Sequence, residues 1–167
     1  PFNRYVFHVR ASYFEETSAI IRQATTVGIK RFAVFYQDND VGQAGLDDVV
    51  RALTPLNLKP IATAKAEANS TDVGPALKTI LASSPEAIIQ IGTFKSSATF
   101  VRLARQGGFK GNLYNLSLVD TQAMSDELGA VARGVVVSQV MPFPYVSGST
   151  VATEYLSALQ ASGLVAS

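Results

Sequence analysis

Short apolar runs recur along the chain, and each is bounded by polar or turn-forming residues. Runs of this length that are rich in β-branched and aromatic residues are typical of strands. A first extended run, Tyr5–Val9, stands near the start of the chain. The strands predicted after it are Phe32–Tyr36, Leu58–Ala64, Ala87–Ile91, Asn112–Leu116 and Gly134–Val140.

Between these runs, apolar residues recur three and four positions apart, which predicts helices with one buried face. Ser12 and Glu15 have the spacing of a capping box, in which each side chain bonds an unpaired amide at a helix start. The predicted helices are Tyr13–Val27, Gly42–Leu53, Val73–Ala82, Lys95–Gln106, Thr121–Leu128 and Thr150–Ala161.

The alternation of strands and helices predicts an α/β fold with a parallel sheet, because each connection is long enough for a right-handed crossover. The second strand carries Lys59 and Pro60 and is followed by Lys65, and both residue types favour a sheet edge. We therefore expect a three-layer flavodoxin-like parallel sheet in the order 2-1-3-4-5. In that order the loops Gln37–Val41 and Thr93–Phe94 lie side by side, at the edge where such sheets bind ligands.

The stretch Arg31–Gly45, RFAVFYQDNDVGQAG, has the pattern of a strand, a polar loop and the start of a helix. It lacks the glycine patterns of dinucleotide-binding and phosphate-binding loops, and the chain has no G-x-S-x-G for a serine hydrolase. Asp38 and Asp40 resemble the magnesium-binding acids of a response regulator. However, the end of the third strand, Ile91–Phe94, offers no carboxylate to accept a phosphoryl group. Local turns and helix capping are the simpler roles for both acids.

The composition narrows the class of protein further. With 167 residues, of which 47% are hydrophobic and 16% charged, the chain can bury one sizeable core and is not disordered. The net charge of +1 and the scattered basic residues argue against nucleic-acid binding. The absence of cysteine removes disulfides, thiolate metal sites and cysteine nucleophiles. No apolar run is long enough to span a bilayer.

The chain offers no set of residues for catalysis. His8 is the only histidine and has no acid–base partner among its neighbours, so an ordinary strand residue is the better interpretation. We therefore expect no enzymatic activity, no catalytic residue, no metal and no cofactor. Because the sequence starts at Pro1 rather than Met, we also expect a processed product or an excerpt.

Several motifs follow one another in a fixed order. They are F-x-x-R at Phe7–Arg10, D-x-x-x-G from Asp38 to Gly42 with Gly45 beyond, then Ser84–Ile88, Gln106–Phe109 and Ala132–Val135. In this order the chain resembles the second lobe of type I periplasmic binding proteins, in particular the leucine/isoleucine/valine-binding branch of ABC-importer receptors. The resemblance covers nearly the whole chain.

The resemblance implies a receptor of two lobes joined by three crossovers, with the ligand clamped between the lobes. Residues 1–10 would be the incoming crossover, 11–140 the ligand-binding lobe, and 141–167 the outgoing crossover and a helix, with Met141–Pro144 as the outgoing segment. Such a receptor is periplasmic, or extracellular and lipid-anchored. It binds a small amino acid or organic acid by hinge closure and docks to an ABC permease in the membrane.

The resemblance also implies which residues meet the ligand. An aromatic contact of the family falls at Val41, another contact at Thr93 beside Phe94, and the acid that meets the ligand's ammonium group falls at Ser117. Without that acid only Asp40 is left as a counter-charge, and a buried ammonium group without one is costly. This favours a carboxylate ligand without an amine, such as an aromatic or aliphatic acid. The alternative is that these positions are ordinary loop residues.

Two other functional classes are compatible with the same fold. One is the effector-sensing domain of a transcriptional regulator, which would need a DNA-binding module upstream. The other is a small flavodoxin-like enzyme, whose turnover would depend on Asp38 and Asp40.

Overall fold

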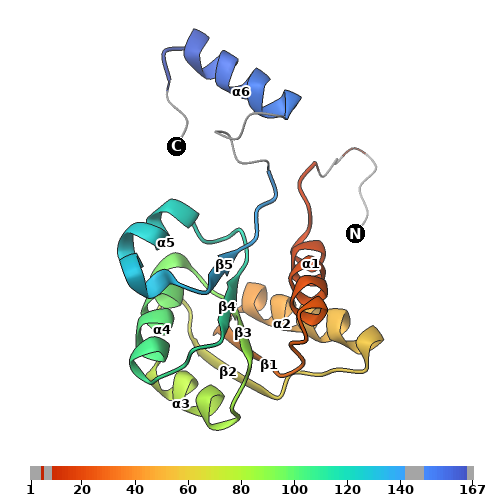
Figure 1. Cartoon of the computed structure of the whole chain (residues 1–167), viewed down its shortest axis with the longest axis vertical. Helices are drawn as coiled ribbons and strands as arrows, with labels where there is room; N and C mark the ends of the chain where they lie inside the picture. Colours follow the sequence, from red (N-terminus) through yellow and green to blue (C-terminus); the bar gives the residue numbers. More distant parts are fainter. Residues whose placement is uncertain (1–4, 6–8, 142–148, 165–167) are drawn as a thin grey trace. The chain divides into compact units, whose positions relative to one another are not determined.

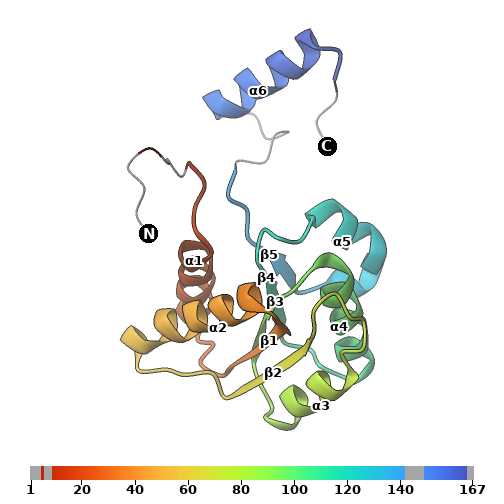
Figure 2. The same ribbon diagram turned by 180° about the vertical axis from the view of Figure 1, so that it is seen from behind.

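The computed structural model describes residue 5 and residues 9–141 and 149–164. Contacts divide the chain into two units, one spanning Ala11–Ser138 and the other combining Pro1–Arg10 with Gln139–Ser167. The larger unit is a sheet with helices on both faces (Figures 1 and 2). The smaller unit contains α6 (Thr150–Ala161), a helix with the bounds that the sequence predicts.

The sheet has five parallel strands in the order β2-β1-β3-β4-β5, which confirms the predicted fold and strand order. Strand β1 lies between β2 and β3, and Tyr36 of β1 is in register with Ile91 of β3. The strands are β1 (Phe32–Asp38), β2 (Ala62–Glu67), β3 (Ala87–Ile91), β4 (Asn112–Asn115) and β5 (Val135–Val137).

Two hydrophobic cores hold the helices to the sheet. Helices α1 and α2 cover one face, where Ile21, Phe32 and Leu53 are almost completely buried. Helices α3, α4 and α5 cover the other face, where the rings of Phe35 and Phe100 stack 4.4 Å apart. Burial of each such side chain contributes about 1.5–3 kcal/mol to stability. The helices of this unit are α1 (Tyr13–Thr26), α2 (Asp40–Leu53), α3 (Gly74–Ala82), α4 (Phe94–Gln106) and α5 (Thr121–Leu128), with 3-10 turns at Thr54–Leu56 and Gly129–Ala132.

Strand β2 begins at Ala62, later than the predicted start at Leu58. After α2 the chain adds the 3-10 turn, and Asn57 then adopts a left-handed conformation with φ of 55°. The chain therefore reaches the sheet only at Ile61, whose amide donates to Phe32 O over 2.8 Å. The predicted edge position of β2 is correct, but of the residues used to predict it only Lys65 lies within the strand.

Most other predicted bounds agree with the structure within two residues. Helix α2 starts at Asp40 rather than Gly42, because Asn39 caps it. Strand β5 is shorter than the predicted Gly134–Val140. The predicted strand Tyr5–Val9, its His8 and the outgoing segment Met141–Pro144 lie largely outside the described residues, so their roles stay predictions. No described helix has the length and apolar character needed to cross a membrane.

Candidate ligand-binding site

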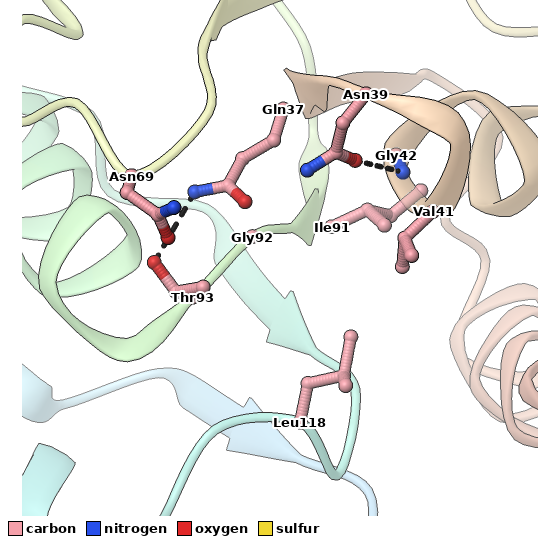
Figure 3. A pocket seen from close by; sticks show the side chains of 9 residues that line it. All are labelled: Gln37, Asn39, Val41, Gly42, Asn69, Ile91, Gly92, Thr93 and Leu118. Atoms are coloured by element: carbon pink, nitrogen blue, oxygen red, sulfur yellow. Dashed lines mark hydrogen bonds between the residues drawn. The ribbon is translucent and has the colours of Figure 1, made fainter.

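A pocket of about 240 Å³ opens where β1 and β3 end (Figure 3). This is the point where the strand order reverses, and ligands bind at such switch points in open α/β sheets. Four loops contribute to it. The lining residues are Gln37, Asn39, Val41, Gly42, Asn69, Ile91, Gly92, Thr93 and Leu118.

Two glycines let the start of α2 come close to the sheet. A Cβ atom on Gly42 would lie 1.9 Å from the backbone oxygen of Gln37, and one on Gly45 would lie 2.6 Å from a side-chain carbon of Ile91. Neither position has room for a side chain. The spacing of these glycines therefore serves close packing, and it brings the first turn of α2 to the rim of the pocket.

Asn39 fixes how the chain enters α2. Its backbone is extended, and its side-chain oxygen accepts a hydrogen bond from the amide of Gly42 over 2.8 Å. This is the usual bond of an N-cap residue, which satisfies one of the unpaired amides of the first turn. Val41 follows in that turn with 51% of its surface exposed, and its side chain lines the pocket.

Gln37 joins the two strand ends beneath the pocket. Its side chain is buried, and its Nε2 donates to Thr93 Oγ1 and to Ser96 Oγ, each over 3.2 Å. The Thr93 hydroxyl acts as the acceptor in the first bond and so keeps one proton that can be donated to a bound molecule. This bond confirms that the loops after β1 and β3 lie side by side, as the predicted strand order requires.

The wall of the pocket is neutral. Amide, hydroxyl and apolar groups make up its lining, and none of the nine lining side chains is charged. Asp38 is paired with Lys65 over 2.9 Å, and its hydrogen bond and charge raise the pKa of Lys65 above the ordinary value. Asp40 is exposed in the first turn of α2, where the helix dipole favours a carboxylate.

The structure brings two of the predicted ligand contacts into the pocket. Val41 and Thr93 line it, whereas Asp40, Phe94 and Ser117 are not among the lining residues. Phe94 is partly buried against the core on the α3–α5 face. Ser117 is bonded to Glu16 through both its backbone amide and its hydroxyl. Whether the five residues contact a ligand stays a prediction.

Sequence reasoning missed several lining residues. Gln37 carried a usable signal, because it is a polar residue two positions after Phe35 and so faces the same core. Asn69 has a left-handed backbone with φ of 61°, which reflects the turn after β2. Leu118 gave no signal, because the path of the loop after β4 is set by packing against both cores.

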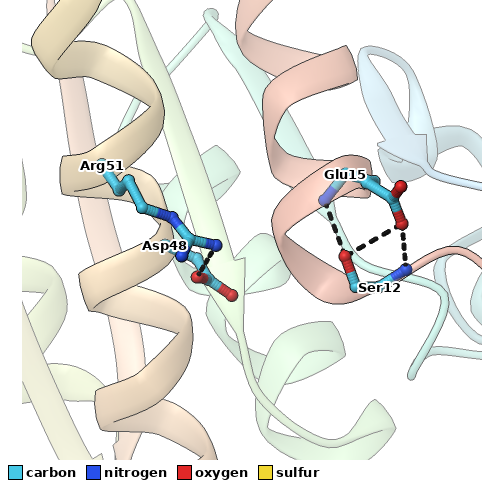
Figure 4. A network of polar contacts seen from close by, with 4 residues as sticks. All are labelled: Ser12, Glu15, Asp48 and Arg51. Carbon is cyan, nitrogen blue, oxygen red and sulfur yellow. Dashed lines mark hydrogen bonds and ion pairs between the residues drawn. The ribbon is translucent and has the colours of Figure 1, made fainter.

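A second hollow, of about 330 Å³, lies over α1 and α2 and shares no lining residue with the first. Arg51 lines this hollow, and its guanidinium lies 3.5 Å from the centre of the Phe14 ring. The same group lies 3.0 Å from Asp48 (Figure 4). This guanidinium is thus already stacked and paired. Nowhere in the part of the chain that the structure describes do three metal-ligating side chains cluster.

Comparison with known proteins places these features in context. Residues 1–163 match the family model described as periplasmic binding protein. A substrate-binding periplasmic protein from Ralstonia solanacearum is 31% identical over 98% of this chain, with a TM-score of 0.84. A possible leucine/isoleucine/valine-binding protein from Rhodopirellula baltica SH 1 is 27% identical over 93%, with a TM-score of 0.86.

A more distant structure shares the fold. It is a branched-chain amino acid ABC transporter protein from Thermus thermophilus with bound valine, 16% identical over 99% of this chain, with a TM-score of 0.82. The chain spans 48%, 44% and 43% of the length of these three proteins. No curated protein sequence matches it.

Proposed function

Since the chain belongs to the periplasmic binding protein family, we propose that it is one lobe of a solute-binding receptor that serves an ABC importer. The observation that carries this proposal is the neutral pocket at the ends of β1 and β3. The pocket lies at the switch point of the sheet, and the chain spans less than half of each relative. Both features fit a half-site that a second lobe completes.

Hinge closure would bury the ligand between the two lobes. The wall of this lobe offers apolar contact at Val41, Ile91 and Leu118, and hydrogen bonds from Thr93 and the amides of Asn39 and Asn69. Closure removes water from both sides of the ligand. The hydrogen bonds to the ligand become stronger, and apolar surface of the ligand and of both lobes is buried. The closed receptor would then dock to a permease in the membrane. The receptor itself would lie in the periplasm or, in a lipid-anchored form, at the cell surface.

The proposed ligand is an organic acid without an amine. An ammonium group turned toward this lobe would lose its hydration without meeting a carboxylate, because no charged side chain lines the pocket. An aromatic or aliphatic body suits the apolar part of the wall, and the other lobe would hold the carboxylate. A branched-chain amino acid is the competing ligand.

A thermal-shift screen of the full-length protein that contains this chain tests both levels of the proposal. Benzoate, hexanoate and valine are suitable probes, because they separate acids with and without an amine. We expect benzoate or hexanoate to raise the melting temperature, since binding to the folded state alone stabilises it. A rise with valine only would contradict the ligand class. No rise in a screen widened to other amino acids and organic acids would contradict the receptor function.

A further inference from the structure

Glu16 is a buried carboxylate in the first turn of α1, with only 4% of its surface exposed. Its Oε1 accepts a hydrogen bond from Ser117 Oγ over 2.8 Å. Its Oε2 accepts from the amide of Ser117 over 2.9 Å and from Ser138 Oγ over 2.5 Å. One side chain thus holds two segments that are far from it in sequence.

The first segment is the loop that carries Leu118 to the pocket. Leu116 and Val119 are buried on opposite faces of the sheet, and the amide of Val119 donates to Leu116 O over 3.1 Å. Between these two anchors, Leu118 is 39% exposed and lines the pocket. Glu16 bonds to Ser117, which directly precedes Leu118, and so supplies a polar anchor of the loop.

The second segment is the point where the chain leaves this unit. Ser138 follows β5, and its amide donates to Asn115 O over 3.0 Å, which extends the ladder between β4 and β5. It is the last residue of the Ala11–Ser138 unit. Because Oε2 of Glu16 accepts from both Ser117 and Ser138, the pocket loop and the chain exit share one anchoring atom.

The chemistry of the anchor requires a carboxylate. A backbone amide and two hydroxyls donate the bonds described above, and an ionised carboxylate accepts at both oxygens. A glutamine has one accepting oxygen and would turn an N–H₂ group toward one of these donors. Bonds to an ionised acceptor are also about twice as strong as neutral ones.

We propose that Glu16 is a positioning residue of the ligand pocket, which holds Leu118 at the pocket rim and couples that loop to the chain exit at Ser138. Glu16 does not line the pocket, so it acts on the ligand only through the loop. The proposal rests on the function proposed above for its effect on ligand binding. The coupling itself is a property of the unliganded protein and can be measured without a ligand.

Amide hydrogen exchange on the full-length, ligand-free protein tests the coupling. We expect Glu16→Gln to speed exchange of the Ser117 and Val119 amides about tenfold and that of the Ser138 amide as well. These amides are hydrogen-bonded in the folded protein, and loss of the ionised acceptor frees both segments. Exchange in β1 should change much less than exchange at these amides, which distinguishes loss of the coupling from a general loss of stability. Glu15→Gln is the matched control, because Glu15 is exposed and, among the described residues, bonds to Ser12 in the capping box (Figure 4).

A double-mutant cycle of Glu16 and Leu118 tests whether Glu16 affects ligand affinity through the loop. The probe is whichever of benzoate, hexanoate and valine binds the wild type most tightly. Glu16→Gln should weaken binding about tenfold in the wild-type background and less than about twofold with Leu118→Ala, because the loop then has no side chain to place. Equal losses in both backgrounds, or unchanged exchange at Ser117, would overturn the proposal. If no probe binds the wild type, the proposed ligand class fails, and the exchange data still decide on Glu16.

Discussion

The side-chain amide of Gln37 donates to the hydroxyl of Thr93 over 3.2 Å, and this bond joins the ends of β1 and β3. Both residues line the pocket at the point where the strand order reverses. Ser96 accepts the second amide proton of Gln37 and itself donates to Thr93 O over 3.0 Å. The floor of the pocket is therefore a small, cross-linked network of neutral polar groups.

Gln37→Leu should destabilise the protein by about 1–3 kcal/mol, because it keeps the volume of the side chain but removes both hydrogen bonds of a buried amide. Chemical denaturation measures this change. Gln43→Leu is the control, since Gln43 is exposed on α2, and its cost should stay within about 0.5 kcal/mol. Equal effects of the two substitutions would show that the network beneath the pocket does not contribute to stability.

Gly42→Ala should destabilise by about 1–3 kcal/mol or more, because the added methyl group would meet the backbone oxygen of Gln37. The start of α2 must then move away from β1, so ligand affinity should fall as well. Gly74→Ala is a matched control at the first position of α3, where the nearest atom lies 3.9 Å from the added carbon. The control should be neutral or slightly stabilising, and a similar loss in both variants would contradict the packing role of Gly42.

Thr93→Val should weaken ligand binding about tenfold, because it removes a hydroxyl of the pocket lining that can donate to a bound molecule. Helix α4 should be little affected, since the Thr93 side chain makes no capping bond. Calorimetric titration of the full-length protein measures the change. Thr99→Val lies on the exposed side of the same helix, where its hydroxyl bonds Lys95 O. The two variants should therefore differ in affinity, and equal affinities would contradict a ligand contact at Thr93.

Glu86 makes stability depend on pH in the acid range. Its carboxylate accepts the backbone amides of Lys30 and Arg31 over 2.8 and 3.0 Å, and these bonds lower its pKa below 4.5. A group whose pKa is lowered on folding contributes stability above its unfolded pKa and loses it as pH falls through the folded value.

Glu86→Gln should therefore lower the melting temperature near neutral pH, and its deficit relative to wild type should shrink below about pH 4. Melting curves between acid and neutral pH measure this dependence. Glu67→Gln, at the exposed end of β2, is the control and should follow the wild type throughout. A deficit for Glu86→Gln that stays constant with pH would contradict the assignment.

The strand order could be predicted from the sequence because edge and inner strands differ in residue type. Lys65 marked β2 as an edge strand, and the mostly apolar run at β3, in which Gln90 is the one polar residue, marked an inner one. The start of β2 could not be predicted, because the left-handed turn at Asn57 delays the return to the sheet.

The candidate site was predictable only where it follows directly from strand ends. Val41, in the first turn of α2, and Thr93, just before α4, follow the ends of β1 and β3, and both line the pocket. Asn69 and Leu118 reach it from loops whose paths depend on packing between distant elements. The contacts of Glu16 with Ser117 and Ser138 were hidden for the same reason, because these partners lie about a hundred positions away in the sequence.

The central claim is that the neutral wall around Val41 holds the ligand, and Val41→Asp tests it most directly. Val41 is half exposed, so the protein should tolerate the change, and Val27→Asp, at the exposed end of α1, is the control. The full-length protein is titrated with benzoate, hexanoate and valine. We expect Val41→Asp, but not Val27→Asp, to bind the preferred acid at least about tenfold more weakly than the wild type. The reason is that the new carboxylate repels an anionic ligand in a partly dehydrated pocket. The account would be contradicted if Val41→Asp bound the preferred acid as tightly as the wild type does. It would also be contradicted if valine were the preferred ligand and bound Val41→Asp more tightly than the wild type.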